Sequence, residues 1–263
     1  MPVTTEERIR GAVIVSGSLA ALQPPLFVMG CGHSGTTVVK ELIGAHSSVF
    51  KTPDDVKLFR LGPAEREETI ARWDAEARAM GCRRWLDKMA AYVHDIDTIL
   101  ARFPHSILFI VIRDGRDVAV SLRKRTGDFA QGVARWIDDN RAALRFAAHP
   151  AVMFVRYEEL VSDPRAVMRR VFERIGEDVE ESIFDFYREN RQSLAVDFAL
   201  GEQLERSDDQ SNFRELRKWQ ICQPLYDGSG KWRTEMQADE REYFKAHAND
   251  LLVDLGYAAD GDW

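Results

Sequence analysis

Residues 30–37 read "GCGHSGTT", three glycines and two threonines directly after a short apolar run. Glycine reaches backbone angles that other residues avoid, so successive N–H groups in such a stretch can point at one anion. The helix expected from Thr36 onward adds its free N–H groups and the positive end of its dipole. The pattern therefore predicts a phosphate-binding loop, with a plain strand-to-helix turn as the alternative.

The loop differs at one position from the familiar G-x-x-x-x-G-K-[ST] pattern of nucleoside triphosphate enzymes. Thr36 stands where that pattern has its lysine. The lysine reaches the β- and γ-phosphates, so its absence removes a main source of charge stabilisation for γ-phosphoryl transfer. The sequence favours a ligand with a terminal 5′-phosphate-type group, and an ATP-dependent phosphotransferase is the disfavoured alternative.

Two stretches resemble one family. G-x-G-x-S-G-T-T after a strand resembles the 5′-phosphosulfate loop of sulfotransferases that use 3′-phosphoadenosine 5′-phosphosulfate (PAPS). "FPHSILFIVIRDGRDVAVSL" at residues 103–122 is similar to that family's F-P-x-A-K-F-I-x-x-x-R-D-x-R-D-V-x-x-S segment. The resemblance implies that Arg113 and Ser121 bind the 3′-phosphate, through a guanidinium fork and a hydroxyl donor. It also implies PAPS as cofactor, adenosine 3′,5′-bisphosphate (PAP) as product, and no metal.

The resemblance extends along the chain. "VRYEELVSDPRAVMRRVFERIG" is similar to the family's R-Y-E-x-L-x-x-x-P segment, which implies that Tyr157 lies near the nucleotide. "GSGKWR" resembles a C-terminal G-x-W-R motif of bacterial members. That match implies closing contacts from Lys231 and Arg233 to phosphate or sulfonate, and Trp232 either against the adenine or in the core. The implied cofactor-binding residues are Gly32, His33, Ser34, Gly35, Thr36, Thr37, Arg113, Ser121, Arg125, Tyr157, Lys231, Trp232 and Arg233.

His33 departs from the family pattern, which usually has lysine or arginine immediately before S-G-T-T. In-line sulfonate transfer needs donors on the leaving oxygen, and an imidazole donates strongly only when it is protonated. The sequence leaves open whether His33 replaces the usual cation or Lys231 carries more of that role.

The acceptor also needs a base. The match of "KTPDDV" to a P-E-E-T-like turn implies Asp54 as the first choice and Asp55 as the second, with a surface Pro-Asp-Asp turn as the alternative. The rival is His94, since some family members use a histidine from a comparable region after a lysine. That histidine lies six residues beyond Lys88, where the family expects two, so a structural role is the alternative. Lys88 is the candidate contact to the sulfonate.

Continuous apolar runs predict buried parallel strands at 26–30, 107–112 and 152–157. Helical patterns occupy the segments between and after these strands. Their alternation predicts an α/β fold, a P-loop-type three-layer α/β/α domain with a central, mainly parallel sheet. The predicted helical segments are 36–44, 60–85, 117–125, 133–149, 162–176 and 237–257.

The chain has 263 residues, a net charge of −7 and a sequence pI of about 5.5, which disfavours a nucleic-acid-binding coat. Its three cysteines form no disulfide or zinc pattern, so a cytoplasmic location is expected. The apolar stretch at 11–22 is too short to span a bilayer and predicts a packed N-terminal element, with a signal peptide as the alternative.

We expect one domain over 1–263, with variable acceptor or lid segments at about 56–85 and 192–228. These segments contain Trp73, Trp85 and Trp219, which indicate either an apolar acceptor surface or core positions. The expected partner is a small-molecule, lipid or glycan acceptor, with no nucleic acid and no stable membrane anchor; a homo-oligomer stays possible. The alternative from a different functional class is a nucleotide-binding protein that has lost catalysis.

Overall fold

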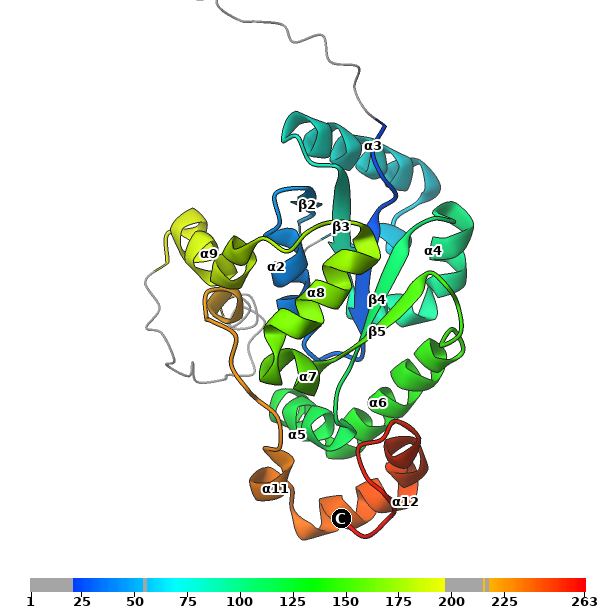
Figure 1. Cartoon of the computed structure of the whole chain (residues 1–263). Coiled ribbons are helices and arrows are strands. Elements are labelled where there is room, and N and C mark those ends of the chain that lie inside the picture. Colours follow the sequence, from blue (N-terminus) through cyan, green and yellow to red (C-terminus); the bar gives the residue numbers. More distant parts are fainter. Residues whose placement is uncertain (1–20, 54–55, 197–214, 216–217) are drawn as a thin grey trace, which may run out of the picture.

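A computed structural model of the chain describes residues 21–53, 56–196, 215 and 218–263. Its centre is a five-stranded parallel sheet in the order β2-β3-β1-β4-β5, with helices on both faces (Figure 1). The predicted three-layer α/β/α class is confirmed. The strands are β1 (Leu26–Gly30), β2 (Val49–Lys51), β3 (Arg84–Lys88), β4 (Ile107–Ile112) and β5 (Val152–Arg156).

Successive residues of the central strands point to opposite faces of the sheet and build two separate cores. Leu26 and Val28 of β1 pack with α2, α8 and α9, whereas Phe27 and Met29 pack with α3, α4 and α6. Every β1 residue is buried, because both faces of the sheet are covered. The helices involved are α2 (Thr36–Gly44), α3 (Pro63–Ala79), α4 (Ile96–Arg102), α6 (Phe129–Leu144), α7 (Tyr157–Ser162), α8 (Pro164–Ile175) and α9 (Phe186–Leu194), with 3-10 turns η1 (Leu58–Arg60), η2 (Ala90–His94) and η3 (Glu181–Asp185).

A third apolar cluster holds the C-terminal part of the chain. It joins α6 to α5 (Gly115–Thr126), α11 (Trp232–Glu235) and α12 (Ala238–Asp254). Figure 1 shows α11 and α12, in orange and red, beside α5 and α6. This cluster brings the C-terminal "GSGKWR" stretch next to the "RDGRD" stretch, far apart in sequence.

Helix α8 shows how closely local sequence signals set the elements. The carboxylate of Asp163 accepts the N–H of Ala166 at 3.0 Å, Pro164 occupies the first turn, and Gly176 ends the helix with φ 72°. The apolar residues that the helical repeat puts on one face, Val167, Met168, Val171, Phe172 and Ile175, are all buried.

Strands β2 and β3 were not predicted, and the predicted helical segment 60–85 is wrong at its end: α3 covers Pro63–Ala79, and β3 begins at Arg84. The sequence of β3 is "RWLDK", which lacks the continuous apolar character of a buried strand. Its polar residues are nevertheless buried, because each has a partner: Arg84 donates to the carbonyl of Ile175 at 2.9 Å, and Asp87 accepts from Tyr92 at 2.7 Å. Tertiary partners therefore override the sequence pattern here.

Several predicted features lie wholly or mostly outside the described residues. They include most of the N-terminal apolar stretch, the Asp54–Asp55 pair, and residues 197–214 of the second variable segment. In the part of the chain that is described, no helix combines the length and apolar content needed to cross a bilayer. All three cysteines are described, and each is buried and unpaired.

Candidate active site

Several of the predicted site residues meet at one edge of the sheet. Because all strand pairs are parallel, their carboxyl ends lie together: Gly30 of β1 is in register with Val111 of β4, and Ile112 with Arg156 of β5. The residues that follow these ends are the glycine-rich loop, Arg113 and Tyr157. Three motifs separated by many residues in the sequence thus form one locus.

The loop of residues 31–35 ends in the first turn of α2. Gly35 is the residue before the helix, with φ 95°, and no side chain caps the first-turn N–H groups. The Ser34 side chain is fully buried, and its hydroxyl has no hydrogen-bond partner among the described residues. Buried hydroxyls are normally paired, so this donor, next to free helix N–H groups, fits an anion at the loop.

Two glycines of the loop make room for specific neighbours. A Cβ added at Gly35 would lie 2.6 Å from Cδ2 of Tyr157, and a Cβ at Gly32 would lie 3.0 Å from Nη2 of Arg135. The Tyr157 ring therefore packs directly on the loop, and its position near a nucleotide stays a prediction. The approach of Arg135 was not predicted.

His33 links the loop to the second motif. It adopts φ 71°, in the left-handed region that is uncommon for a residue other than glycine. Its Nδ1 lies 2.8 Å from Oγ of Ser121, and its Nε2 lies 3.4 Å from Nη1 of Arg125. A guanidinium only donates, so we assign Nε2 as the acceptor and place the proton of a neutral ring on Nδ1.

Arg113 holds three segments together. Its Nη1 donates to the carbonyl of His33 at 3.0 Å, its Nη2 donates to the carbonyl of Gly228 at 2.5 Å, and its guanidinium lies 4.4 Å from the centre of the Tyr157 ring. Its Nε is buried without a partner among the described residues. The unsatisfied charged donor fits a phosphate at this position.

Hydrogen bonds hold residues 226–232 against the "RDGRD" stretch and Tyr157. The carboxylate of Asp117 accepts the N–H groups of Gly230 at 2.7 Å and Trp232 at 2.9 Å. Burial raises the pKa of Asp117, while the charge of Arg113 opposes that shift. The Tyr157 hydroxyl donates to the carbonyl of Tyr226 at 3.2 Å, and burial raises its pKa as well.

The three predicted residues of this segment fall in different surroundings. The Trp232 side chain is 4% exposed and packs in the C-terminal cluster, with the guanidinium of Arg116 3.9 Å from its ring centre. The structure thus places it in the core, one of the two positions that the sequence left open. Lys231 and Arg233 are exposed, and the Lys231 ammonium lies 5.9 Å from the Tyr226 ring centre.

Lys88 is the last residue of β3 and lies next to the start of α2. Its Nζ is 3.4 Å from Oγ1 of Thr37, so the predicted sulfonate contact adjoins the first turn of α2. The preceding residue of β3 is Asp87, whose buried carboxylate accepts hydrogen bonds from the hydroxyl of Thr52 at 3.0 Å and from that of Tyr92 at 2.7 Å. Burial raises the pKa of Asp87. This network ties Thr52, two residues before the Asp54–Asp55 pair, to the sheet.

His94 lies in η2 and forms a pair with α6. Its Nε2 is 2.8 Å from Oδ1 of the buried Asp139 and 3.6 Å from Oδ2 of the exposed Asp138. These three residues could share a cation, but Arg135 already pairs with Asp139 at 3.3 Å and supplies positive charge. Asp54 and Asp55 are outside the described residues, so their roles stay predictions.

Sequence reasoning missed three residues around the site: Arg135, Asp139 and Asp117. Asp117 carried a signal, since it lies one helical turn after Arg113 in the "RDGRD" stretch. Arg135 and Asp139 belong to an amphipathic helix whose charged residues look like an ordinary solvated face. Only the packing of α6 against the loop reveals them.

The aromatic residues of the first variable segment provide no described acceptor surface. The side chains of Trp73 and Trp85 are at most 2% exposed, and their rings pack edge to face with centres 5.2 Å apart. Both belong to the core between the sheet and helices α3, α4 and α6. Trp219 is also buried.

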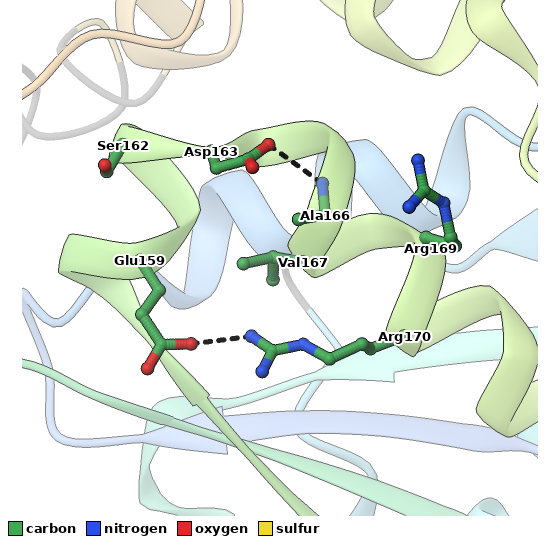
Figure 2. A pocket seen from close by; sticks show the side chains of 7 residues that line it. All are labelled: Glu159, Ser162, Asp163, Ala166, Val167, Arg169 and Arg170. Atoms are coloured by element: carbon green, nitrogen blue, oxygen red, sulfur yellow. Dashed lines mark hydrogen bonds and ion pairs between the residues drawn. The ribbon is translucent and has the colours of Figure 1, made fainter.

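An open surface pocket between α7 and α8 is separate from these residues (Figure 2). Three of its polar side chains are already paired: Glu159 with Arg170 at 2.6 Å, and Asp163 with the N–H of Ala166. None of the predicted site residues lines it, so we do not assign it a role in the site.

Sequence comparison agrees with the resemblance to sulfotransferases. A family model described as "Sulfotransferase family" matches residues 61–181, which include Lys88, Arg113 and Ser121. The glycine-rich loop lies before the matched range, so its assignment is an independent observation.

Solved sulfotransferase structures share the fold. A mouse sulfotransferase, SULT7A1 complexed with PAP, is 15% identical with a TM-score of 0.59, covering 89% of this chain and 87% of that one. The sulfotransferase domain of the curacin biosynthetic pathway is 15% identical with a TM-score of 0.55, and the match covers 86% of this chain and 98% of that domain. The sulfotransferase domain of the Synechococcus PCC 7002 olefin synthase is 18% identical with a TM-score of 0.52, and the match covers 79% of this chain and 96% of that domain.

A curated relative is longer than this chain. An uncharacterized protein of Aquifex aeolicus (strain VF5) is 23% identical in a 207-residue alignment that covers 64% of this chain and 27% of that protein. The chain therefore spans about a quarter of the length of the curated relative that it matches.

Proposed function

We propose that this chain is a sulfotransferase that moves a sulfonate group from PAPS to a hydroxyl or amine. The observation that carries the proposal is the double contact of His33, whose carbonyl binds Arg113 and whose ring contacts Ser121. This contact joins the phosphate loop and the second anion motif into one locus. Two anion positions on one ligand suit a nucleotide with phosphates at both ends of its ribose, rather than a triphosphate.

The residues present fit such a donor. The loop N–H groups, with the unpartnered hydroxyl of Ser34 and the hydroxyls of Thr36 and Thr37, would hold the 5′-phosphosulfate. Arg113, whose buried Nε is unsatisfied, and Ser121 would hold the 3′-phosphate. PAP in the mouse sulfotransferase structure, which shares the fold, supports this assignment.

The donor supplies the sulfonate and a phosphate leaving group when it is bound. The acceptor oxygen or nitrogen attacks sulfur, the bond from sulfur to the bridging phosphate oxygen breaks, and the acceptor proton passes to a base. The loop donors stabilise the charge that develops on the phosphate, and Lys88 is placed to contact the sulfonate.

For the base we propose Asp54, with Asp55 second and His94 as the rival. The described structure gives His94 one useful feature: Asp139 contacts its Nε2 and orients the ring. Asp54 follows Thr52 and Pro53, and Thr52 is anchored to Asp87. The acceptor itself is proposed only by class, as a small molecule, lipid or glycan.

Calorimetry with PAP and with ATP–magnesium tests the nucleotide assignment. We expect PAP to bind and ATP–magnesium to bind far more weakly, because Thr36 replaces the lysine that triphosphate sites use. Preferential binding of ATP–magnesium would overturn the proposal.

A second experiment tests catalysis. The protein is incubated with PAPS labelled in its sulfonate group and a panel of hydroxyl and amine acceptors, and labelled products are counted. Transfer to any acceptor supports an enzyme. Tight PAP binding without transfer to any acceptor class would favour a nucleotide-binding module.

A further inference from the structure

Arg135 of α6 has no role in the proposal above, yet its guanidinium lies against the phosphate loop. We propose that Arg135 supplies the positive charge that the loop lacks, and binds the 5′-phosphate end of the donor. The inference rests on the proposed function and assigns one further binding residue to the same site.

The position of Arg135 follows from the glycine at residue 32. A Cβ added there would lie 3.0 Å from Nη2 and 3.2 Å from Cζ of Arg135. The guanidinium therefore occupies the space that a side chain would fill beside the loop backbone. Gly32 keeps that space open at the point where the loop N–H groups begin.

Asp139 fixes this orientation. Its buried carboxylate lies 3.3 Å from Nε of Arg135, one helical turn earlier, and 2.8 Å from Nε2 of His94. The Nε contact holds the stem of the guanidinium. The Arg135 side chain remains 39% exposed, so it is not sealed inside the protein.

The need for this charge follows from His33. Its Nδ1 contacts Ser121 and its Nε2 faces Arg125, so the ring is directed toward the second anion motif. A guanidinium is charged at all ordinary pH values and can donate twice to one phosphate.

Matched nucleotides test the assignment without measuring catalysis. PAP carries both phosphates, whereas 3′-AMP lacks the 5′-phosphate. We expect Arg135→Met to weaken PAP binding by about 10- to 100-fold, the range for a lost charge-assisted hydrogen bond, and to change 3′-AMP binding less than about twofold. Calorimetry measures both affinities. Arg141→Met, an exposed arginine of the same helix, should change neither.

Two further variants guard against a folding defect. Arg135→Lys keeps the charge and should recover part of the PAP affinity. Gly32→Ala crowds the guanidinium, because the added Cβ would lie 3.0 Å from Nη2, and should weaken PAP binding by less than Arg135→Met does. Thermal unfolding of each variant separates binding from stability.

The outcomes separate the two proposals. Equal losses for PAP and 3′-AMP, or no loss for PAP, would overturn the role of Arg135 while leaving the proposed function in place. Wild-type protein that binds neither nucleotide would overturn the proposed function and this assignment with it.

Discussion

The proposed donor side of the site and its proposed acceptor side differ in how their residues are placed. On the donor side, residues at the ends of β1, β4 and β5 contact one another directly: Arg113 reaches both His33 and Gly228, and Tyr157 packs on Gly35. On the acceptor side, the candidates are His94 in a 3-10 turn and the Asp54–Asp55 pair, which is outside the described residues.

The difference shows how contacts to a single donor and contacts to a variable acceptor can share a site. The proposed donor has fixed charges, so its contacts sit on rigid elements at the ends of parallel strands. An acceptor changes from one enzyme to another, and its contacts come from connecting segments. If this division holds, changes on the donor side alter nucleotide affinity, and changes on the acceptor side alter only the rate.

The largest effect is expected for Asp54→Asn, which would remove the proposed base. The acceptor-dependent rate should fall by about 100- to 10,000-fold, as for the loss of a general base, while PAP affinity stays unchanged. Steady-state kinetics and calorimetry give the two values. His94→Ala measured in parallel identifies the rival, and the exposed Asp97→Asn is the control. An unchanged rate for Asp54→Asn would remove this residue from the acceptor side.

Arg113→Met tests the donor side by affinity. It removes the guanidinium proposed for the 3′-phosphate and its tie to Gly228, so PAP binding should weaken by about 100- to 1,000-fold. Calorimetry measures the change, and the exposed Arg145→Met serves as the control. Full PAP affinity in Arg113→Met would break the division between the two sides.

Gly35→Ala tests the rigidity of the donor side. The substitution forces alanine to φ 95° and against the Tyr157 ring, and should lower the free energy of unfolding by about 2–4 kcal/mol. Gly81→Ala, before β3, is the matched control: its φ is 73° with no atom within 4 Å, so only the backbone cost of about 1–2 kcal/mol remains. Denaturant unfolding compares them, and equal losses would argue against the tight packing of Tyr157 on the loop.

The smallest effect is expected for Tyr157→Phe. The ring stays against Gly35 and Arg113, but the hydroxyl no longer contacts the backbone of Tyr226 and Gly228. A loss of about 1 kcal/mol, or roughly three- to tenfold in PAP affinity, is expected for hydrogen bonds that only position a segment. Calorimetry measures it, with the exposed Tyr243→Phe as control. A hundredfold loss would mean that the hydroxyl binds the nucleotide directly.

Much of the fold could be predicted from local patterns. The continuous apolar runs located β1, β4 and β5, and the helical pattern located α8 within two residues at its start and one at its end. Strand β3 could not be found this way, because Arg84, Asp87 and Lys88 are buried only through partners from other parts of the chain.

The site residues also divide into those that local sequence predicts and those that only the packing reveals. The residue types and spacing of "GCGHSGTT" and "RDGRD" were sufficient to predict two anion-binding motifs, because phosphate recognition depends on short-range features: glycines, a helix start and an arginine after a strand. These are properties of a few consecutive residues.

Only the tertiary structure decided which residues share the site. It placed Trp232 in the core, turned His33 toward Ser121 and Arg125, and brought Arg135 against Gly32. Each of these outcomes depends on how α5, α6 and the C-terminal helices pack, which involves residues 80 or more positions apart. The sequence by itself determined that phosphate could bind, and the packing of distant elements decided which charges surround it.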